Sequence, residues 1–153
     1  MKKYLFLAFL MISATKVWAE QVVIQTKNTT MVLNVEGNKQ PQYVYFGTRL
    51  SDYDLQNMQL PRNGRMDAYP AYGMNCPAEA AIAMRHADGN MSTVLVADYV
   101  DEIEGDGNNR EYRIRLVDPV YPVTVDLCYR AVYDEDIIET WTEIQNGEKK
   151  PVT

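Results

Sequence analysis

The stretch from Arg110 to Ile144, REYRIRLVDPVYPVTVDLCYRAVYDEDIIETWTEI, decides the fold. Apolar and polar side chains alternate along three segments of it, and alternation with a period of two predicts β-strands that bury one face. Two turn-like clusters, Asp118–Pro122 and Tyr133–Asp136, interrupt the alternation. Three strands joined by short turns favour an antiparallel sheet. The arginine-bearing face of this sheet is expected to point to solvent or to a neighbouring domain.

The same alternation recurs upstream, around residues 22–24, 31–35, 43–46, 80–86 and 93–103. The dipeptide Asp88-Gly89 predicts a hairpin between the last two of these segments. The only segment after residue 19 with a plausible helical pattern, Glu79–His86, fits a strand equally well. About eight strands at regular spacing predict an all-β fold, an antiparallel β-sandwich of two packed sheets.

Residues 51–79 differ from the rest because glycine, proline, asparagine and aspartate are frequent in them. This composition predicts a long loop with one helical turn. Long loops in compact domains are usually either functional or disordered. The aromatic residues Tyr69 and Tyr72 argue against disorder, so this loop is the first place to look for a binding site.

The first 19 residues have the pattern of a signal peptide. Lys2 and Lys3 precede a short apolar run, and Val17 and Ala19 occupy the small-residue positions of a cleavage site. The run is too short to span a bilayer and no second one follows, so no membrane partner is expected. We therefore predict a signal peptide over residues 1–19, a sandwich domain over residues 20–153, and a periplasmic or secreted location.

Composition limits the candidate partners. The chain has 21 acidic and 15 basic side chains, a formal net charge of −6. An acidic chain repels phosphate, so nucleic acid and anionic lipid are not expected partners, whereas a neutral sugar is compatible. The single histidine, His86, and the two cysteines match no zinc pattern, so neither a metal nor a cofactor is predicted. Export makes a Cys76–Cys128 disulfide chemically feasible, but two free thiols are the preferred interpretation.

The C-terminal residues predict an unfinished element. Gln145–Glu148 has the composition of a hairpin turn after the strand at 137–144. A second strand should then pair with this one, but only Lys149–Thr153 follow. So short an arm would leave backbone groups of its partner exposed. We therefore expect a domain that is truncated at its C-terminal end.

Several short tracts in a fixed order carry a resemblance. They are Tyr45–Gly47, Tyr69–Gly73 and Arg85–Gly89, followed by the final stretch from Val123 to Thr153. Their order and spacing resemble the N-terminal domain of family 36 glycoside hydrolases, over about residues 40–153. Each tract is a common turn or strand taken alone, so the resemblance rests on the set.

The resemblance implies a multi-domain α-galactosidase, in which a β-supersandwich precedes a catalytic (β/α)₈ barrel. Two aspartates of the barrel would perform a retaining double displacement, and this chain would lack them. The chain would then be an accessory domain, an incomplete supersandwich whose partners are the barrel and an α-galactoside. Members of the family resemble homo-oligomers in which the loop after Tyr72-Gly73 approaches a neighbour's active site. This sequence reads Met74–Ala78 there, without the usual charged residues.

Four residues of the long loop are the candidate substrate-binding residues: Arg65, Asp67, Tyr69 and Tyr72. Aromatic rings stack on the C–H face of sugars, and their hydroxyls can hydrogen-bond to sugar hydroxyls. Arg65 and Asp67 could bond to the ligand or pair with each other. The competing interpretation, which we prefer, is that both tyrosines pack against the sandwich.

Other polar groups favour structural interpretations. Asp52 and Asp54 form a carboxylate pair in a loop, where nothing fixes the short separation that retaining hydrolysis needs. His86 has no predicted catalytic partner, and the acidic run Asp101–Asp106 does not match a calcium-binding loop. No catalytic residue is predicted. The alternative to an accessory domain is a self-contained carbohydrate-binding sandwich that uses Tyr69 and Tyr72 as a platform.

Overall fold

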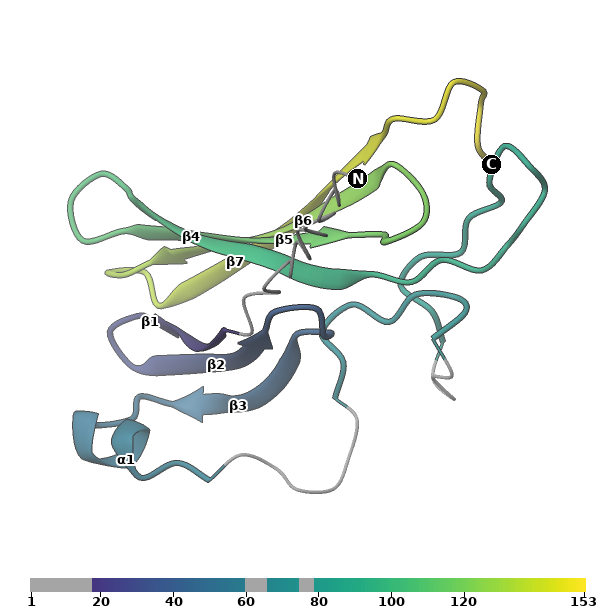
Figure 1. The fold of residues 1–153 in the computed structure, drawn as a ribbon. Helices are drawn as coiled ribbons and strands as arrows, with labels where there is room; N and C mark the ends of the chain where they lie inside the picture. Colours follow the sequence, from purple (N-terminus) through teal and green to yellow (C-terminus); the bar gives the residue numbers. More distant parts are fainter. Residues whose placement is uncertain (1–17, 60–65, 75–78) are drawn as a thin grey trace, which may run out of the picture.

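The structure, a computed structural model, describes residues 18–59, 66–74 and 79–153 (Figure 1). In these ranges the chain forms seven strands and one short helix. The elements are β1 (Ala19–Gln25), β2 (Thr29–Glu36), β3 (Gln42–Thr48), α1 (Asp52–Gln56), β4 (Val96–Glu104), β5 (Arg110–Val117), β6 (Val123–Val132) and β7 (Ile137–Asn146).

The strands form two antiparallel sheets, one with the order β1-β2-β3 and one with the order β4-β5-β6-β7. The three-stranded sheet lies beneath the four-stranded one in Figure 1, and loops gather at the end of the sandwich where the C-terminus lies. The predicted all-β fold with two antiparallel sheets is confirmed. Within each sheet, every strand pairs with its neighbour in sequence, so the connections inside a sheet are short.

The stretch that begins at Arg110 forms the centre of the larger sheet. Ile114 pairs with Leu127 in register, and both side chains are buried. One residue along, Arg115 pairs with Asp126, which in turn pairs with Glu143 of β7 on the outer face. Alternate residues of a strand point to opposite faces, so this register buries the apolar set and leaves the charged set on the outside.

The inner faces of both sheets share one hydrophobic core. The three-stranded sheet contributes Val22, Ile24, Leu33 and Val35 to it, and the loops contribute Ala71, Ile82, Met84 and Leu95. Burial of apolar surface stabilises such a core by roughly 25 cal/mol per Å² removed from water. The loop segments before β4 are therefore part of the core, and they are held in place at the end of the sandwich.

The helical turn predicted within residues 51–79 is α1. Ser51 is its N-cap and forms a capping box with Asp54, in which each side chain bonds to the other residue's backbone N–H. No residue of α1 is buried, so the helix is stabilised by its capping box and its own backbone hydrogen bonds rather than by packing on the core. Among the residues that the structure describes, no helix is long and apolar enough to cross a membrane.

The segment at 80–86 was expected to be a strand of a hairpin, and this expectation is wrong. Its side chains alternate as expected, with Ile82, Met84 and His86 buried. Its backbone, however, makes only one isolated bridge, between Ile82 and Ala71. The Asp88-Gly89 turn forms, since His86 N–H donates to Asn90 O over 2.8 Å, but no ladder follows it. Burial here comes from packing on the core rather than from strand pairing.

The turn after β7 also differs from the expectation. Gly147 N–H donates to Pro122 O over 2.7 Å, which directs the chain away from β7. Residues 147–153, which we term the C-terminal strap, cross the loop end of the sandwich. There the N–H of Arg85 donates to Thr153 O over 2.6 Å, and Thr153 N–H donates to Arg85 O over 3.2 Å. The outer edge of β7 has no strand beside it among the described residues.

Candidate functional site

The loop end of the sandwich holds the described candidate substrate-binding residues, Asp67, Tyr69 and Tyr72. It is built from four segments: 66–74, 79–93, 118–122 and the C-terminal strap. Backbone hydrogen bonds join them in series: Tyr72 N–H donates to Ile82 O (3.0 Å) and Thr93 N–H donates to Tyr72 O (2.8 Å). The segments therefore form one connected surface, visible beside the C-terminus in Figure 1.

The two candidate tyrosines point to different environments. Tyr69 is half-buried and packs against the hydrophobic core. Burial raises the pKa of its hydroxyl, and a hydrogen bond with Thr142 of β7 acts in the opposite sense. Tyr72 is 53% exposed. The structure therefore places Tyr69 against the inside of the larger sheet and leaves Tyr72 as the exposed ring of the pair.

Gly73 fixes the position of Tyr72. Its φ is +116°, a conformation that side chains rarely tolerate, and a Cβ there would lie 2.6 Å from Ser92 Oγ. The close approach of Gly73 to Ser92 permits the Thr93–Tyr72 backbone bond. The sequence pattern Tyr-Gly thus has a local physical cause, in addition to its place in the resemblance.

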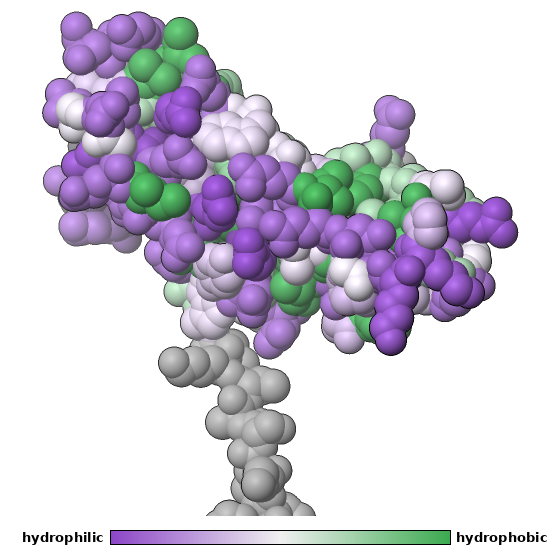
Figure 2. All heavy atoms as spheres, turned by 90° about the horizontal axis from the view of Figure 1, so that it is seen from above, coloured by the Kyte–Doolittle hydropathy of each residue, from purple (hydrophilic) through white to green (hydrophobic). Residues whose placement is uncertain are grey.

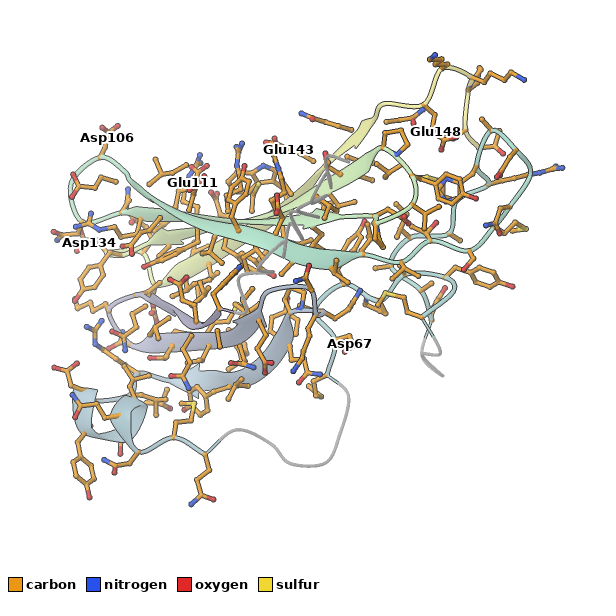
Figure 3. All side chains as sticks on the ribbon, viewed as in Figure 1. Asp67, Asp106, Glu111, Asp134, Glu143 and Glu148 are labelled. Carbon is orange, nitrogen blue, oxygen red and sulfur yellow. The ribbon has the colours of Figure 1, made fainter. Side chains whose placement is uncertain are left out.

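The two charged candidates are less informative. Asp67 forms an isolated antiparallel bridge with Gln42 at the start of β3, and its side chain is partly exposed, as labelled in Figure 3. Arg65 lies outside the described residues. The structure therefore attaches Asp67 to the edge of the three-stranded sheet.

A buried polar network centred on His86 was missed by the sequence reasoning. Its Nδ1 lies 2.8 Å from Glu148 Oε1, and its Nε2 lies 3.1 Å from Thr93 Oγ1. Glu148 Oε2 also accepts a hydrogen bond from Ala87 N–H over 2.9 Å. The carboxylate of Glu148, labelled in Figure 3, thereby joins the C-terminal strap to the 79–93 loop. Because 62 residues separate the partners, no local signal could have predicted the pair.

The order hydroxyl, imidazole, carboxylate is that of a nucleophile with its base and orienting acid. Here, however, Thr93 is fully buried and the His86 side chain is also inaccessible. The ring of Tyr121 stacks on the imidazole, with centroids 3.6 Å apart and planes at 8°. A substrate cannot reach the Thr93 hydroxyl in this arrangement, so the network is a structural clasp between the strap and the loop.

The carboxyl groups with resolved pKa shifts have structural surroundings. A general acid for glycoside cleavage needs a raised pKa. All four resolved carboxyl shifts are downward instead, and each arises mainly from a hydrogen bond in a turn or cap. The donors are Lys39 to Glu36, Ser51 to Asp54, the Asn90 backbone to Asp88, and Thr26 to Asp136. These groups are ionised hydrogen-bond acceptors that stabilise turns.

The outer face of the four-stranded sheet carries a lattice of charges. Arg115 forms a bidentate pair with Asp126, with Nε–Oδ1 and Nη2–Oδ2 distances of 2.7 and 2.6 Å. These hydrogen bonds raise the pKa of the Arg115 guanidinium. Figure 2, which views the molecule from above this sheet, shows a mainly hydrophilic surface with small hydrophobic areas. The alternation of charge in the sequence indicated this face, but not its pairings.

Neither a cluster of metal-binding side chains nor a reactive thiol is found in the described ranges. No group of three or more His, Cys, Asp or Glu side chains lies close enough to hold a metal there. Cys128 is a free, buried thiol, and burial raises its pKa, which disfavours the reactive thiolate. Cys76 lies outside the described residues.

The architecture and the site together place this chain among antiparallel β-sandwich domains, in which the carboxylates with shifted pKa values stabilise turns. The model of the glycosyl hydrolase family 36 N-terminal domain matches residues 39–153. The chain belongs to this family. None of the curated proteins matches the sequence.

Solved structures of family 36 enzymes share the fold. The α-galactosidase AgaA of Geobacillus stearothermophilus superposes with a TM-score of 0.73 at 17% identity, over 87% of this chain and 23% of its own. The α-galactosidase of Lactobacillus brevis gives 0.69 at 15%, over 86% and 22%. The galactosidase domain of AgaSK gives 0.72 at 15%, over 89% and 24%. This chain thus spans about a quarter of the length of each relative. AgaA variants were solved with stachyose and with raffinose.

Proposed function

We propose that this chain is the N-terminal accessory domain of an exported α-galactosidase-like glycoside hydrolase. The observation that carries the proposal is the family match over residues 39–153. The shared fold of AgaA supports it, since this chain aligns with only 23% of that enzyme. In such an enzyme the catalytic (β/α)₈ barrel lies in the remaining polypeptide, and its two aspartates cleave terminal α-galactosides with retention.

The role of the domain in this proposal is to pack against the barrel, shape the rim of its active site and support contacts in a homo-oligomer. Tyr72 is the residue best placed for such a contact, because it is exposed on a loop that Gly73 and the core hold in position. The basic start and apolar run of residues 1–19 support export to the periplasm or the medium.

The test of family function is genetic. Sequencing the source DNA beyond the Thr153 codon should reveal an open frame that encodes a barrel with two aspartates. A stop codon directly after Thr153 would contradict the proposal and favour a small self-contained protein.

A biochemical test asks whether the sandwich domain alone has hydrolase activity. Purified residues 20–153 should not hydrolyse an aryl α-galactoside, because in this proposal the two aspartates of the retaining mechanism belong to the barrel. Turnover above a buffer control would assign catalysis to the sandwich and overturn the accessory role.

A further inference from the structure

The C-terminal strap is attached to the loop end by backbone bonds and by one buried side chain. At its start Gly147 N–H donates to Pro122 O over 2.7 Å, and at its end Thr153 and Arg85 exchange two backbone hydrogen bonds. Between these points the side chain of Glu148 is only 8% exposed, and Figure 3 labels it beside the loops. The strap therefore presents a single carboxylate to the interior of the loop end.

A row of hydrogen bonds leads from this carboxylate to the loop that carries Tyr72. Glu148 Oε1 lies 2.8 Å from His86 Nδ1, and His86 Nε2 lies 3.1 Å from Thr93 Oγ1. The N–H of Thr93 donates to Tyr72 O over 2.8 Å, and Tyr72 N–H donates to Ile82 O over 3.0 Å. We term this row the relay; its members are Glu148, His86, Thr93 and Tyr72. It joins two segments that are distant in the sequence.

The carboxylate decides which nitrogen of the imidazole accepts. An ionised carboxylate can only accept hydrogen bonds, so His86 Nδ1 carries a hydrogen and donates to Glu148. In the neutral ring Nε2 is then the acceptor, and the Thr93 hydroxyl donates to it. Without the carboxylate the ring is free to adopt the other tautomer, in which Nε2 no longer accepts from Thr93. The two bonds of His86 are therefore coupled through its tautomer.

The middle of the relay is buried and held on one face. Thr93 has no exposed surface, and the His86 side chain is inaccessible as well. The ring of Tyr121 stacks on the imidazole at 3.6 Å, and the Tyr121 hydroxyl donates to Asp88 Oδ2 over 2.9 Å. A buried bond that is broken is not replaced by a bond to water, so a change at one link alters the next.

The receiving end of the relay is tightly packed along its backbone. A Cβ at Gly73 would lie 2.6 Å from Ser92 Oγ and 3.0 Å from Thr93 N, so the two backbone segments are in close contact. The ring of Tyr72, by contrast, is 53% exposed. A displacement of Thr93 therefore reaches Tyr72 through contact as well as through a hydrogen bond, and moves a ring that is available to a partner.

We propose that the C-terminal strap is a positioning device for Tyr72: the ring is held in place while Glu148 is bonded to His86, and it is released when the strap detaches. Glu148, His86 and Thr93 are then positioning residues, since they act on Tyr72 through one another. The use of the device rests on the proposed function, in which Tyr72 contacts the barrel or a second subunit. The coupling itself is a property of this chain and is tested in this chain alone.

Native-state amide hydrogen exchange, followed by NMR in the full chain, tests the coupling. Glu148→Ala should raise the exchange rates of the Tyr72 and Thr93 amides about tenfold, as expected for the loss of one buried hydrogen bond from a local unit. Glu139→Ala removes a half-exposed carboxylate of β7 and should leave both rates unchanged. Unchanged rates in folded Glu148→Ala would overturn the proposal.

A stability control separates positioning from general loosening of the fold. Ile114→Ala creates a cavity in the core, away from the relay, and should leave the Tyr72 and Thr93 rates unchanged because these amides exchange through a local opening. An equal rise in Ile114→Ala and Glu148→Ala would show that the loop opens only with the whole domain, which would also contradict a positioning role.

The second test interrupts the relay at another link and leaves the strap in place, so it also serves if Glu148→Ala does not fold. Thr93→Val removes the hydroxyl and should raise the Tyr72 exchange rate about tenfold, whereas Thr93→Ser, which keeps the hydroxyl, should raise it less. Combining Thr93→Val with Glu148→Ala should add little, because both changes break the same row. A rise of about a hundredfold would mean independent effects and no relay. Such a failure concerns the relay alone, because the accessory role is tested by the genetic experiment.

Discussion

At the scale of single residues, the Glu148 side chain joins two segments that are distant in the sequence. One carboxylate accepts hydrogen bonds from the His86 ring and the Ala87 backbone, and both of its partners belong to a different segment of the chain. Its side chain is almost completely buried. Removal of such an acceptor leaves buried donors without partners. Each of these donors then destabilises the folded state, because it has lost its hydrogen bond to water without gaining another.

Glu148→Ala should therefore lower the free energy of unfolding by about 1–3 kcal/mol. Equilibrium urea denaturation of the purified chain measures it. The matched control is Glu139→Ala, which removes a half-exposed carboxylate that pairs with Arg130 at 3.3 Å. This exposed pair should contribute about 0–1 kcal/mol. Equal losses in the two variants would show that the clasp does not stabilise the fold.

Asp136 links the two sheets through an ionised carboxylate. It accepts hydrogen bonds from Thr26 and from the Asn28 backbone, and chiefly the Thr26 bond lowers its pKa. A carboxyl group whose pKa is lower in the folded state than in the unfolded state stabilises the native state at every pH above its unfolded-state pKa. That contribution is lost as the pH falls through the folded-state pKa. For Asp136 the loss therefore occurs below the ordinary pKa of aspartate, about 4.

Asp136→Asn tests this pH dependence without disturbing the backbone. Asp136 has a φ of 59°, a left-handed conformation that asparagine also tolerates. The variant should be less stable than the original chain at pH 7, and the difference should shrink below about pH 4. Denaturant unfolding at a series of pH values measures it, with Asp134→Asn in the same turn as the control. A difference that stays constant with pH would indicate a neutral packing effect.

At the scale of elements, β5 and β6 hold the sandwich together because each contributes alternate residues to one core. Ile114 has no exposed surface and faces Leu127 across the pair. Ile114→Ala should cost about 2–5 kcal/mol, through lost apolar burial and the cavity left behind. Val120→Ala is the control, because Val120 is 77% exposed. Denaturant unfolding measures both; similar values would mean that β5 is not part of the cooperative core.

The elements also show how far the sequence predicts the fold. The strands from β5 to β7 follow from period-two alternation, since their turns are short and each pairs with the next. Residues 80–86 alternate equally well, yet they form no ladder. Alternation reports which side chains are buried and carries no information about the backbone's partner. In the same way, Asn146-Gly147 indicates a turn, but the bond from Gly147 to Pro122 sets its direction.

The candidate site was harder to predict than the strands, for a related reason. Tyr69 and Tyr72 have the same chemistry and lie three residues apart, so sequence reasoning assigned both to one interpretation. Their environments differ because Thr142 and the core lie beside Tyr69, while Tyr72 is exposed and bonds through its backbone to Ile82 and Thr93. Contacts between distant segments decide this, as they do for His86 and Glu148.

At the scale of the whole molecule, large apolar side chains are exposed on both sheets. On the three-stranded sheet, an apolar groove of about 560 Å³ runs beside β3, lined in part by Met31 and Phe46. On the four-stranded sheet, Ile144 lies on the same face of β7 as Ile138 and remains half-exposed. An unpaired edge strand with apolar side chains is a template for pairing with another chain.

The isolated chain should therefore self-associate through β7 in a concentration-dependent way. Ile144→Lys should shift it toward the monomer, because a charge on an edge strand opposes strand addition and does not disturb the buried core. Sedimentation velocity over a range of protein concentrations measures the change. Val120→Lys adds the same charge to an exposed loop position and should leave association unaltered. A chain that stays monomeric at all concentrations, or equal effects of the two lysines, would show that the β7 edge is already protected by its own geometry.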